Sequence, residues 1–305
     1  MFVIKNVRIL DPASATDMVG NIGIDGGKIT AIGTVEAKAE DSILDGKGLV
    51  AAPGLVDTHV HFRDPGLTYK EDIYSGAHAA AAGGFTSVVC MANTKPIADN
   101  PDTISYIVKK GKKTGIHVYT AAAVTKEFDG KNLTDFKELL QAGAIGFTDD
   151  GIPIKDAGIV KSAMEMAAEL DVPISLHEED PDLIERPGVN QGKVSEKLNY
   201  GGAPARSEYE MVQRDCELAL QTRAKTVIQH ISSAETVEAV RQCWKRGGKI
   251  YGEVTPQHFS ATEDLVLEKG ALARVNPPLR TEEDRRAIIE GLKDGTLNII
   301  ATDHA

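Results

Sequence analysis

The sequence has few cysteines, and their arrangement excludes a disulfide scaffold. Cys90, Cys216 and Cys243 are the three cysteines in 305 residues, and no two of them form a C-x-x-C pair. An odd number of scattered thiols is typical of proteins from a reducing compartment. We therefore expect a cytoplasmic protein whose cysteines are reduced and structural.

A net positive charge and long apolar runs are also missing. The chain has 34 Lys and Arg against 45 Asp and Glu, a formal charge of −11. This balance argues against a nucleic-acid partner, and an anionic small substrate would need its own local positive charge. No apolar run approaches membrane-spanning length, and the opening MFVIKNVRIL lacks the pattern of a secretory signal. We expect no membrane partner.

The first fifty residues differ in texture from those that follow. Short β-type runs at 2–10, 21–33 and 42–54 are separated by Gly, Asp and Asn turn signals. They predict that residues 1–50 form the N-terminal part of a small, antiparallel β-sandwich domain. Residues 51–305 are expected to form one large domain with its own core.

Residues 51–305 alternate apolar strands with amphipathic helices. Strands are expected at 54–62, 86–94, 117–124, 144–150, 173–179, 226–232, 249–259 and 297–305, and helices at 69–84, 133–143, 159–171, 207–224, 233–248 and 280–295. Eight such strands predict a (β/α)8 TIM-type barrel, with an open doubly wound sheet as the alternative. The barrel is favoured because polar residues end nearly every strand, and in a barrel those ends converge on one mouth.

Metal-ligating residue types gather at these strand ends. His59 and His61, two residues apart, point to the same side of a strand and suit adjacent positions on one metal ion. Four other strands end in His177, His230, Asp303, and either Asp149 or Asp150, between which spacing cannot choose. Imidazoles and carboxylates without thiolate predict a catalytic site for Zn²⁺ or a similar divalent ion. Six ligands exceed the needs of one tetrahedral ion, so two metals are expected.

The chain resembles the cyclic amidohydrolase superfamily, and most closely the dihydroorotases of the long bacterial type. The motifs that carry the resemblance are DTHVHFRDPG, MANTKP, GFTDDG, SLHEED, QHIS, EVTPQHF, NPPLR and ATDHA. The pair HFRDPG and NPPLR is highly specific, whereas H-x-H alone fits many amidohydrolases. The resemblance covers essentially the whole chain.

The resemblance implies a role for each candidate residue. One Zn²⁺ ion would be held by His59, His61 and Asp303, and a second by His177 and His230, with Asp150 and a hydroxide bridging the two. Asp303 would also be the catalytic proton shuttle. Substrate-binding roles are implied for Arg63, Asn93 and Asn276. Arg63 can offer a planar fork to a carboxylate, and it supplies the positive charge that the acidic chain otherwise lacks.

Some relatives bridge their metals with a carbamylated lysine. Here GFTDDG contains no lysine, and Lys155 lies in the loop that follows. An aspartate bridge is therefore expected.

The function implied by the resemblance is that of a zinc-dependent dihydroorotase, which reversibly hydrolyses dihydroorotate to N-carbamoyl-L-aspartate in pyrimidine biosynthesis. One alternative is a related hydantoinase, dihydropyrimidinase or allantoinase, whose neutral ring has no carboxylate for Arg63. Another is a non-catalytic dihydroorotase-like subunit. A small-molecule substrate is expected, and a homodimer and a transcarbamoylase partner are compatible with the resemblance.

The chain departs from the family pattern in two places. Gln257 stands where the family usually carries a histidine. The family motif at the eighth strand continues past Asp-His-Ala, whereas this sequence stops at Ala305. We expect a catalytic domain that ends just after strand eight, with the C-terminal part of the family's chain missing.

Overall fold

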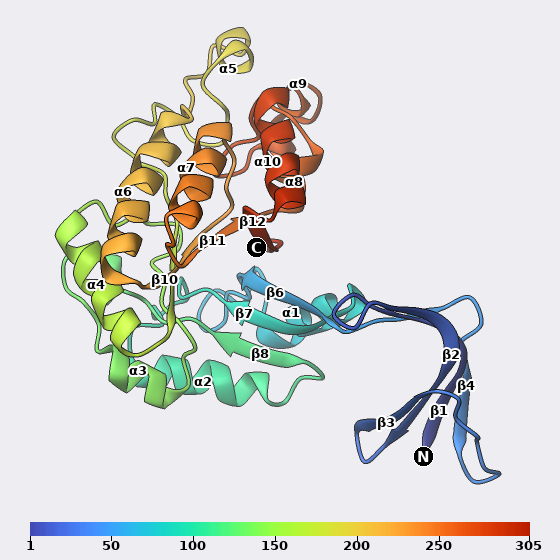
Figure 1. Cartoon of the computed structure of the whole chain (residues 1–305). Helices are drawn as coiled ribbons and strands as arrows, with labels where there is room; N and C mark the ends of the chain where they lie inside the picture. The colour runs from blue at the N-terminus through green and yellow to red at the C-terminus, as the bar shows by residue number, and fades with distance from the viewer. The chain divides into compact units, whose positions relative to one another are not determined.

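The computed structural model describes all 305 residues, which separate into two compact units, Met1–Leu55 and Val56–Ala305 (Figure 1). The first unit is a single five-stranded sheet. Its strands are β1 (Phe2–Asp11), β2 (Thr16–Asp25), β3 (Lys28–Gly33), β4 (Ser42–Asp45) and β5 (Val50–Ala51). The order is β3-β2-β1-β4, with β5 also paired to β1.

The expectation of a purely antiparallel N-terminal unit was wrong. β1 pairs antiparallel with β2, but both β4 and β5 run parallel to β1. Ser42–Asp45 and Val50–Ala51 pair with the same edge of β1. A tight hairpin can join only antiparallel strands, and these two strands are joined to β1 through long stretches of chain. These five strands make one sheet, without the second layer of a sandwich.

The second unit contains two parallel sheets that join into a ring. One is β6-β7-β8 and the other is β12-β11-β10-β9. The strands are β6 (Leu55–Val60), β7 (Phe85–Cys90), β8 (His117–Thr120), β9 (Pro173–Leu176), β10 (Lys225–Ile228), β11 (Ile250–Val254) and β12 (Leu297–Ile300). A parallel bridge between Val60 and His304 joins β6 to the segment after β12.

The fourth predicted strand, at 144–150, is not a regular strand. Phe147 alone bridges Ala122 on one side and Ile174 on the other, and so occupies the place between β8 and β9. The backbone carbonyl of Phe147 accepts a hydrogen bond from the amide of Ser175 at 2.8 Å. The pairing is too short to be a ladder, but it closes the ring of parallel strands expected of a barrel.

Helices connect the strands in the βα order. They are α1 (Ile73–Ala82), α2 (Pro101–Gly111), α3 (Phe136–Ala142), α4 (Ala157–Glu169), α5 (Lys193–Lys197), α6 (Arg206–Thr222), α7 (Ala234–Lys245), α8 (Pro256–Ser260), α9 (Leu265–Lys269) and α10 (Glu282–Asp294), with short 3-10 turns at Lys126–Phe128 and Gly270–Ala273. None of them has both the length and the apolar character required to cross a bilayer.

Two differences from the sequence interpretation concern helices. The predicted strand 249–259 ends at Val254, because Pro256 begins α8 as its first residue and Thr255 stands at the N-cap. The helix α2 was not predicted, although Asn100 caps it by accepting from the amide of Thr103 and Pro101 occupies its first turn.

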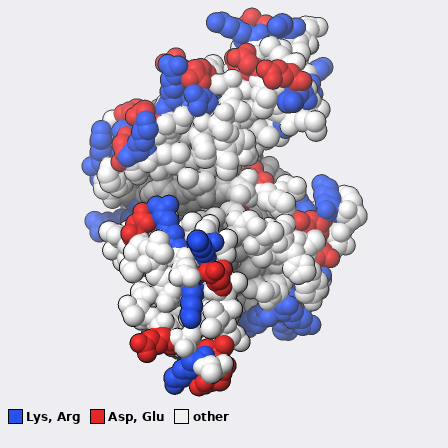
Figure 2. All heavy atoms as spheres, turned by 90° about the vertical axis from the view of Figure 1, so that its right-hand side faces the viewer, with Lys and Arg blue, Asp and Glu red and all other residues white.

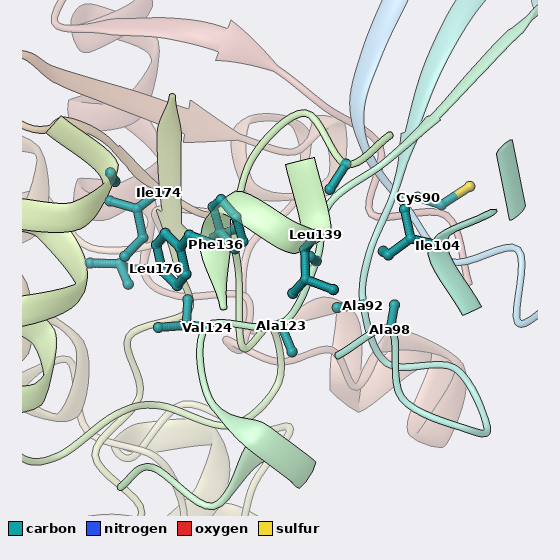
Figure 3. Packing of buried hydrophobic residues seen from close by; sticks show 14 of the residues in the cluster. Cys90, Ala92, Ala98, Ile104, Ala123, Val124, Phe136, Leu139, Ile174 and Leu176 are labelled. Atoms are coloured by element: carbon teal, nitrogen blue, oxygen red, sulfur yellow. The ribbon is translucent and has the colours of Figure 1, made fainter. Parts of the chain in front are cut away.

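A large apolar core lies between the first strands and their helices. Phe136 and Phe147 stack with ring centroids 3.6 Å apart, and Figure 3 shows Leu139, Ile174 and Leu176 packed near Phe136. A second core cluster packs α6, α7 and α10 against β10, β11 and β12. Helix α1 packs closely against Phe62, which follows β6. A Cβ on Gly76 would lie 2.3 Å from the Phe62 ring, so this helix position requires glycine.

Candidate metal centre

The first part of the candidate centre is built at the end of β6, where His59 lies in the strand and His61 follows it directly, on the same side. The Nε2 atom of His59 lies 3.3 Å from Oδ1 of Asp150 and 3.3 Å from Oδ1 of Asp303. The Nε2 atom of His61 lies 2.9 Å from Oδ1 of Asp303 and 3.4 Å from Oδ2 of Asp150. The structure thus brings together two imidazoles and two carboxylates that are far apart in the sequence.

The second part comes from the ends of β9 and β10. Nδ1 of His177 lies 2.8 Å from Nε2 of His230 and 3.8 Å from Oδ1 of Asp150. Asp150 therefore stands between the two imidazole pairs. His59, His61 and Asp150 form one set of potential ligand atoms within 4.8 Å of one another, and Asp150, His177 and His230 form another.

Three of these histidines have a partner on the ring nitrogen that faces away from Asp150. Nδ1 of His59 lies 2.9 Å from Oε1 of Glu253, Nδ1 of His61 lies 2.9 Å from Oδ1 of Asn93, and Nε2 of His177 lies 3.4 Å from Oε2 of Glu179. These oxygens can accept a ring N–H, so each imidazole is held with its other nitrogen directed toward the carboxylates and the facing imidazole of the centre. Such partners orient imidazoles at metal sites.

Sequence reasoning missed Glu253 and Glu179. Glu253 lies on β11, whose burial pattern leaves only Tyr251 exposed. A glutamate inside a strand that is otherwise buried is a costly placement unless it is paired, and this is the signal that could have identified it. Asn93, predicted to bind substrate, also donates from Nδ2 to Oδ2 of Asp150 at 3.1 Å.

The adjacent residues Asp149 and Asp150 point to different places. Asp149 accepts hydrogen bonds from the amides of Val124 at 2.7 Å and Thr125 at 3.0 Å, and also from the Thr125 hydroxyl. Burial raises the pKa of Asp149 to about 6. Asp149 therefore holds the loop after β8, and Asp150 is the carboxylate that lies among the imidazoles. Lys155 is paired with Asp182, away from them.

The charges of the centre are strongly coupled. Burial disfavours ionised Asp150, but the imidazoles of His59, His61 and His177 outweigh it, so the pKa of Asp150 lies well below its usual range. Burial also disfavours a charged His59, yet Glu253 and Asp150 raise its pKa. Burial and the neighbouring His177 lower the pKa of His230. The buried carboxylates of the centre are thus held in their negative form, and they stabilise a positive charge placed among them.

The residues present fit divalent cations. Nε2 of His59 is buried and has no hydrogen-bond partner, although it faces Asp150 and Asp303. A buried, unpaired nitrogen is costly unless something binds it. Imidazole nitrogens and carboxylate oxygens, with no thiolate, are the donors expected for a catalytic Zn²⁺ or a similar ion.

A cavity of about 340 Å³ opens beside these side chains. Its lining includes His61, Asp150, His177, His230 and Asp303, together with the predicted substrate-binding residues Arg63, Asn93 and Asn276. Nε of Arg63 is buried and unpaired. Arg63, His230 and Asp303 have positive φ values of 57°, 33° and 51°. Backbone strain of this kind concentrates at functional sites.

A buried network holds the loops around the cavity. Nε of Arg280 donates to the Ser232 hydroxyl at 2.8 Å, and its Nη1 donates to Oδ1 of Asn190 at 2.8 Å and to the carbonyl of Ala203 at 2.9 Å. Nη2 of Arg280 lies 3.9 Å from Oε2 of Glu208. One side chain thus joins the segments that follow β9, β10 and α9. On the same segment as Arg280, the Pro277 carbonyl accepts from Nε2 of His258 at 2.9 Å.

Charged side chains of both signs are spread over the face shown in Figure 2. Over most of this face, Lys and Arg side chains lie among Asp and Glu side chains.

Comparison with known proteins relates the chain to one family. The family model described as dihydro-orotase-like matches residues 47–236. The chain is 54% identical over 306 residues to a dihydroorotase of Clostridioides difficile strain 630 and 52% identical over 305 residues to one of Streptococcus thermophilus strain CNRZ 1066. These matches cover all of this chain and 73% and 72% of the relatives.

Solved structures show the same fold. An L-hydantoinase (dihydropyrimidinase) from Arthrobacter aurescens matches with a TM-score of 0.83 at 22% identity, over 99% of this chain and 69% of that one. A D-hydantoinase matches with a TM-score of 0.81 at 24% identity, over 99% and 68%. The fold is therefore the α/β barrel of these amidohydrolases. The two dihydroorotases, at 54% and 52% identity, are more similar to this chain in sequence than the two hydantoinases, at 22% and 24%. The chain belongs to the dihydroorotase family.

Proposed function

We propose that this chain is a metal-dependent cyclic amidohydrolase that opens dihydroorotate to N-carbamoyl-L-aspartate and catalyses the reverse ring closure in pyrimidine biosynthesis. The observation that carries the proposal is the position of Arg63, which lines the same cavity as His61, His177 and His230. A guanidinium there suits a cyclic amide that bears a carboxylate. The chain's overall charge of −11 makes this local cation necessary for an anionic substrate.

The residues that would hold two divalent cations are the ones already grouped by geometry. His59, His61 and Asp303 would bind one ion, His177 and His230 the other, and Asp150, which is within reach of both pairs, would bridge them. Bound there, cations such as Zn²⁺ would supply Lewis acidity to the ring carbonyl and to the attacking water.

Asp303 is the proposed proton carrier. Burial disfavours its charge, but the hydrogen bond with His61 and the nearby His59 and His230 lower the pKa of Asp303, so it is a carboxylate that can accept a proton. Water attacks the ring carbonyl carbon, and the ring C–N bond breaks. Asp303 takes the proton of the attacking water and gives it to the departing nitrogen. The second proton of the water goes to solvent, so the products of ring opening are a new carboxylate and a ureido nitrogen, and ring closure reverses each transfer.

Arg63 and Asn276 are proposed to hold the substrate. Nε of Arg63 has no partner in the protein, so its fork is free to bind a carboxylate. Asn276 also lines the cavity and offers an amide to the ring's polar atoms. The amide of Asn93 contacts both His61 and Asp150. Asn93 is therefore better placed to orient these two proposed ligands than to bind the substrate.

The test compares two substrates in one variant. Arg63→Met keeps the length of the side chain but removes its charge and fork. The loss of kcat/KM on dihydroorotate should be about 100-fold or more, which corresponds to about 2.7 kcal/mol, because a charge-assisted bidentate contact is lost. Dihydrouracil, which has no carboxylate, should show little further loss. Arg63→Lys keeps the charge but not the fork. Its kcat/KM on dihydroorotate should therefore lie between that of the wild type and that of Arg63→Met.

Equal losses on both substrates would favour the hydantoinase-like alternative. Metal analysis of the same samples separates the remaining alternative. A non-catalytic subunit would show no turnover of carbamoyl-aspartate even when its metal content is full, whereas the proposed enzyme requires both.

A further inference from the structure

Cys216 and Cys243 face each other across the contact between α6 and α7. The sulfur of Cys243 lies 3.5 Å from the backbone carbonyl of Cys216, and the sulfur of Cys216 lies 3.7 Å from the backbone carbonyl of Ala239. In an α-helix the carbonyl of residue 239 accepts from the amide of residue 243. Each sulfur therefore lies beside the backbone of the other cysteine, so the two stand at one level of the helix pair.

Both cysteines line a cavity of about 550 Å³ between these helices. The cysteines themselves are 4% and 1% exposed, but the cavity reaches the surface, because the pair Arg246 and Glu217 that also lines it has side chains 54% exposed. The thiols are buried and still lie against a space that a small molecule can enter.

The third cysteine provides a contrast. Cys90 lies on β7 in the core cluster that contains Phe136 and Ile104 (Figure 3), and burial raises the pKa of its thiol to about 12. Unlike the pair, Cys90 does not line the cavity between α6 and α7. The access of small molecules to Cys216 and Cys243 therefore distinguishes them from Cys90.

We propose that Cys216 and Cys243 form a thiol–disulfide exchange site that small-molecule disulfides convert to an intrachain disulfide. The thiolate of one cysteine of the pair attacks one sulfur of the small disulfide, whose S–S bond breaks and whose other half leaves as a thiol after taking up a proton. The second cysteine then loses its proton to solvent and attacks the sulfur of the first, and the second half of the small disulfide leaves and takes up a proton. Two protein thiols are oxidised, and one small disulfide is reduced to two thiols.

The fold favours this exchange, because α6 and α7 are already joined at their N-terminal ends. Oε1 of Glu208, in the first turn of α6, accepts from the hydroxyl of Ser233, the N-cap residue of α7, at 3.1 Å. A disulfide requires two Cα atoms within about 7 Å and no large backbone shift. It would link two helices whose relative position is fixed in the reduced protein.

The test uses the folded full chain and the neutral probe hydroxyethyl disulfide. After incubation, unreacted thiols are blocked under denaturing conditions and counted by intact mass. We expect two of the three thiols to be lost, a mass decrease of two hydrogens, and a linked peptide that contains residues 216 and 243. A reductant should reverse all three changes. Retention of all three thiols, or separate mixed disulfides on both residues, overturns the proposal.

Cys90 serves as an internal monitor of unfolding. If oxidation took place through the unfolded chain, Cys90 would become reactive at the same rate. We expect the link to form at least about tenfold faster than a thiol reagent labels Cys90 in the same sample. Equal rates contradict an exchange site in the folded protein. Cys90→Ser should still form the link, whereas Cys216→Ser and Cys243→Ser should not.

Discussion

Each histidine of the centre offers one nitrogen to a metal and needs its other nitrogen fixed. Glu253 does this for His59, and the same carboxylate atom, Oε1, also accepts from the backbone amide of His230 at 3.2 Å. One glutamate on β11 therefore orients a ligand of each proposed metal. Its role comes from position in the fold, because residue 253 is far from both histidines in sequence.

Glu253→Gln should weaken metal binding without unfolding the protein. The amide keeps an oxygen that accepts from His59 but loses the negative charge that makes this imidazole a stronger ligand. We expect a fall in metal affinity of about tenfold or more, within the range found for such partners. Competition with a chromophoric chelator measures it. Glu283→Gln, on the exposed side of α10, is the matched control and should bind metal normally.

Substitutions of the two neighbouring aspartates should affect different properties, metal binding at Asp150 and fold stability at Asp149. Asp150→Asn should abolish most metal binding and activity, and in the presence of chelator its unfolding temperature should equal that of the chelated wild type, because Asp150 serves the centre. Asp149→Asn should keep the ligands but destabilise the fold by about 1–3 kcal/mol, because its oxygens satisfy the buried amides of Val124 and Thr125. Metal content and thermal unfolding of both variants decide the matter. If Asp149→Asn is the variant that loses metal, the assignment of Asp150 is wrong.

At the scale of elements, the segment from Pro277 to Arg280 depends on buried contacts rather than on regular structure. Arg280 joins Ser232, Asn190 and the carbonyl of Ala203, and it lies near the buried Glu208. Two residues of the motif NPPLR thus have different roles. Asn276 lines the cavity, and Arg280, four residues later, anchors the segment that carries it.

Arg280→Met should lower the free energy of unfolding by about 3 kcal/mol, because it leaves Glu208 buried without its cationic neighbour. We also expect a lower kcat with unchanged metal content, since no metal ligand is removed. Denaturant unfolding and steady-state kinetics test both points. Arg286→Met is the control: it breaks an exposed pair with Glu282 and should cost less than about 1 kcal/mol.

The sequence predicted most strands because parallel, buried strands are apolar runs with polar ends. The fourth was predicted as a full strand and is a single bridge at Phe147, because its backbone groups divide between the Ala122 segment and β9 and make no continuous ladder. The predicted strand 249–259 was too long for a different reason. Pro256 cannot continue a ladder but can begin a helix, so His258 lies on α8.

The candidate ligands could be proposed from residue type and strand position. The partners that orient them could not, because Glu253 and Glu179 meet their histidines only through tertiary packing. Spacing also left Asp149 and Asp150 equivalent, and only the direction of each side chain in the folded chain separates them. The N-terminal sheet was misjudged because runs in sequence do not reveal that β4 pairs parallel to β1.

At the scale of the whole molecule, the centre draws ligands from five places along the chain between His59 and Asp303. A cation that binds this arrangement has no equivalent site in the unfolded chain. Chelation should therefore lower the unfolding temperature of the unit Val56–Ala305, and at free metal about 1,000 times Kd the stabilisation lost is about 4 kcal/mol. Calorimetry with and without chelator measures it. His177→Ala should respond less, and an equal response would place the bound metal elsewhere.

The join at Phe147, with one isolated bridge to each neighbouring segment, has a kinetic consequence. It is the one point where the sheet that carries His59 and His61 meets the sheet that carries His177 and His230 on that side of the ring, and Asp150 follows three residues later. A join held by so few hydrogen bonds opens more readily than the ladders beside it. The amides of Phe147 and Thr148 should therefore exchange with solvent deuterium sooner than those of β7 or β10. Their exchange rates then report how firmly the carboxylate between the two imidazole pairs is held.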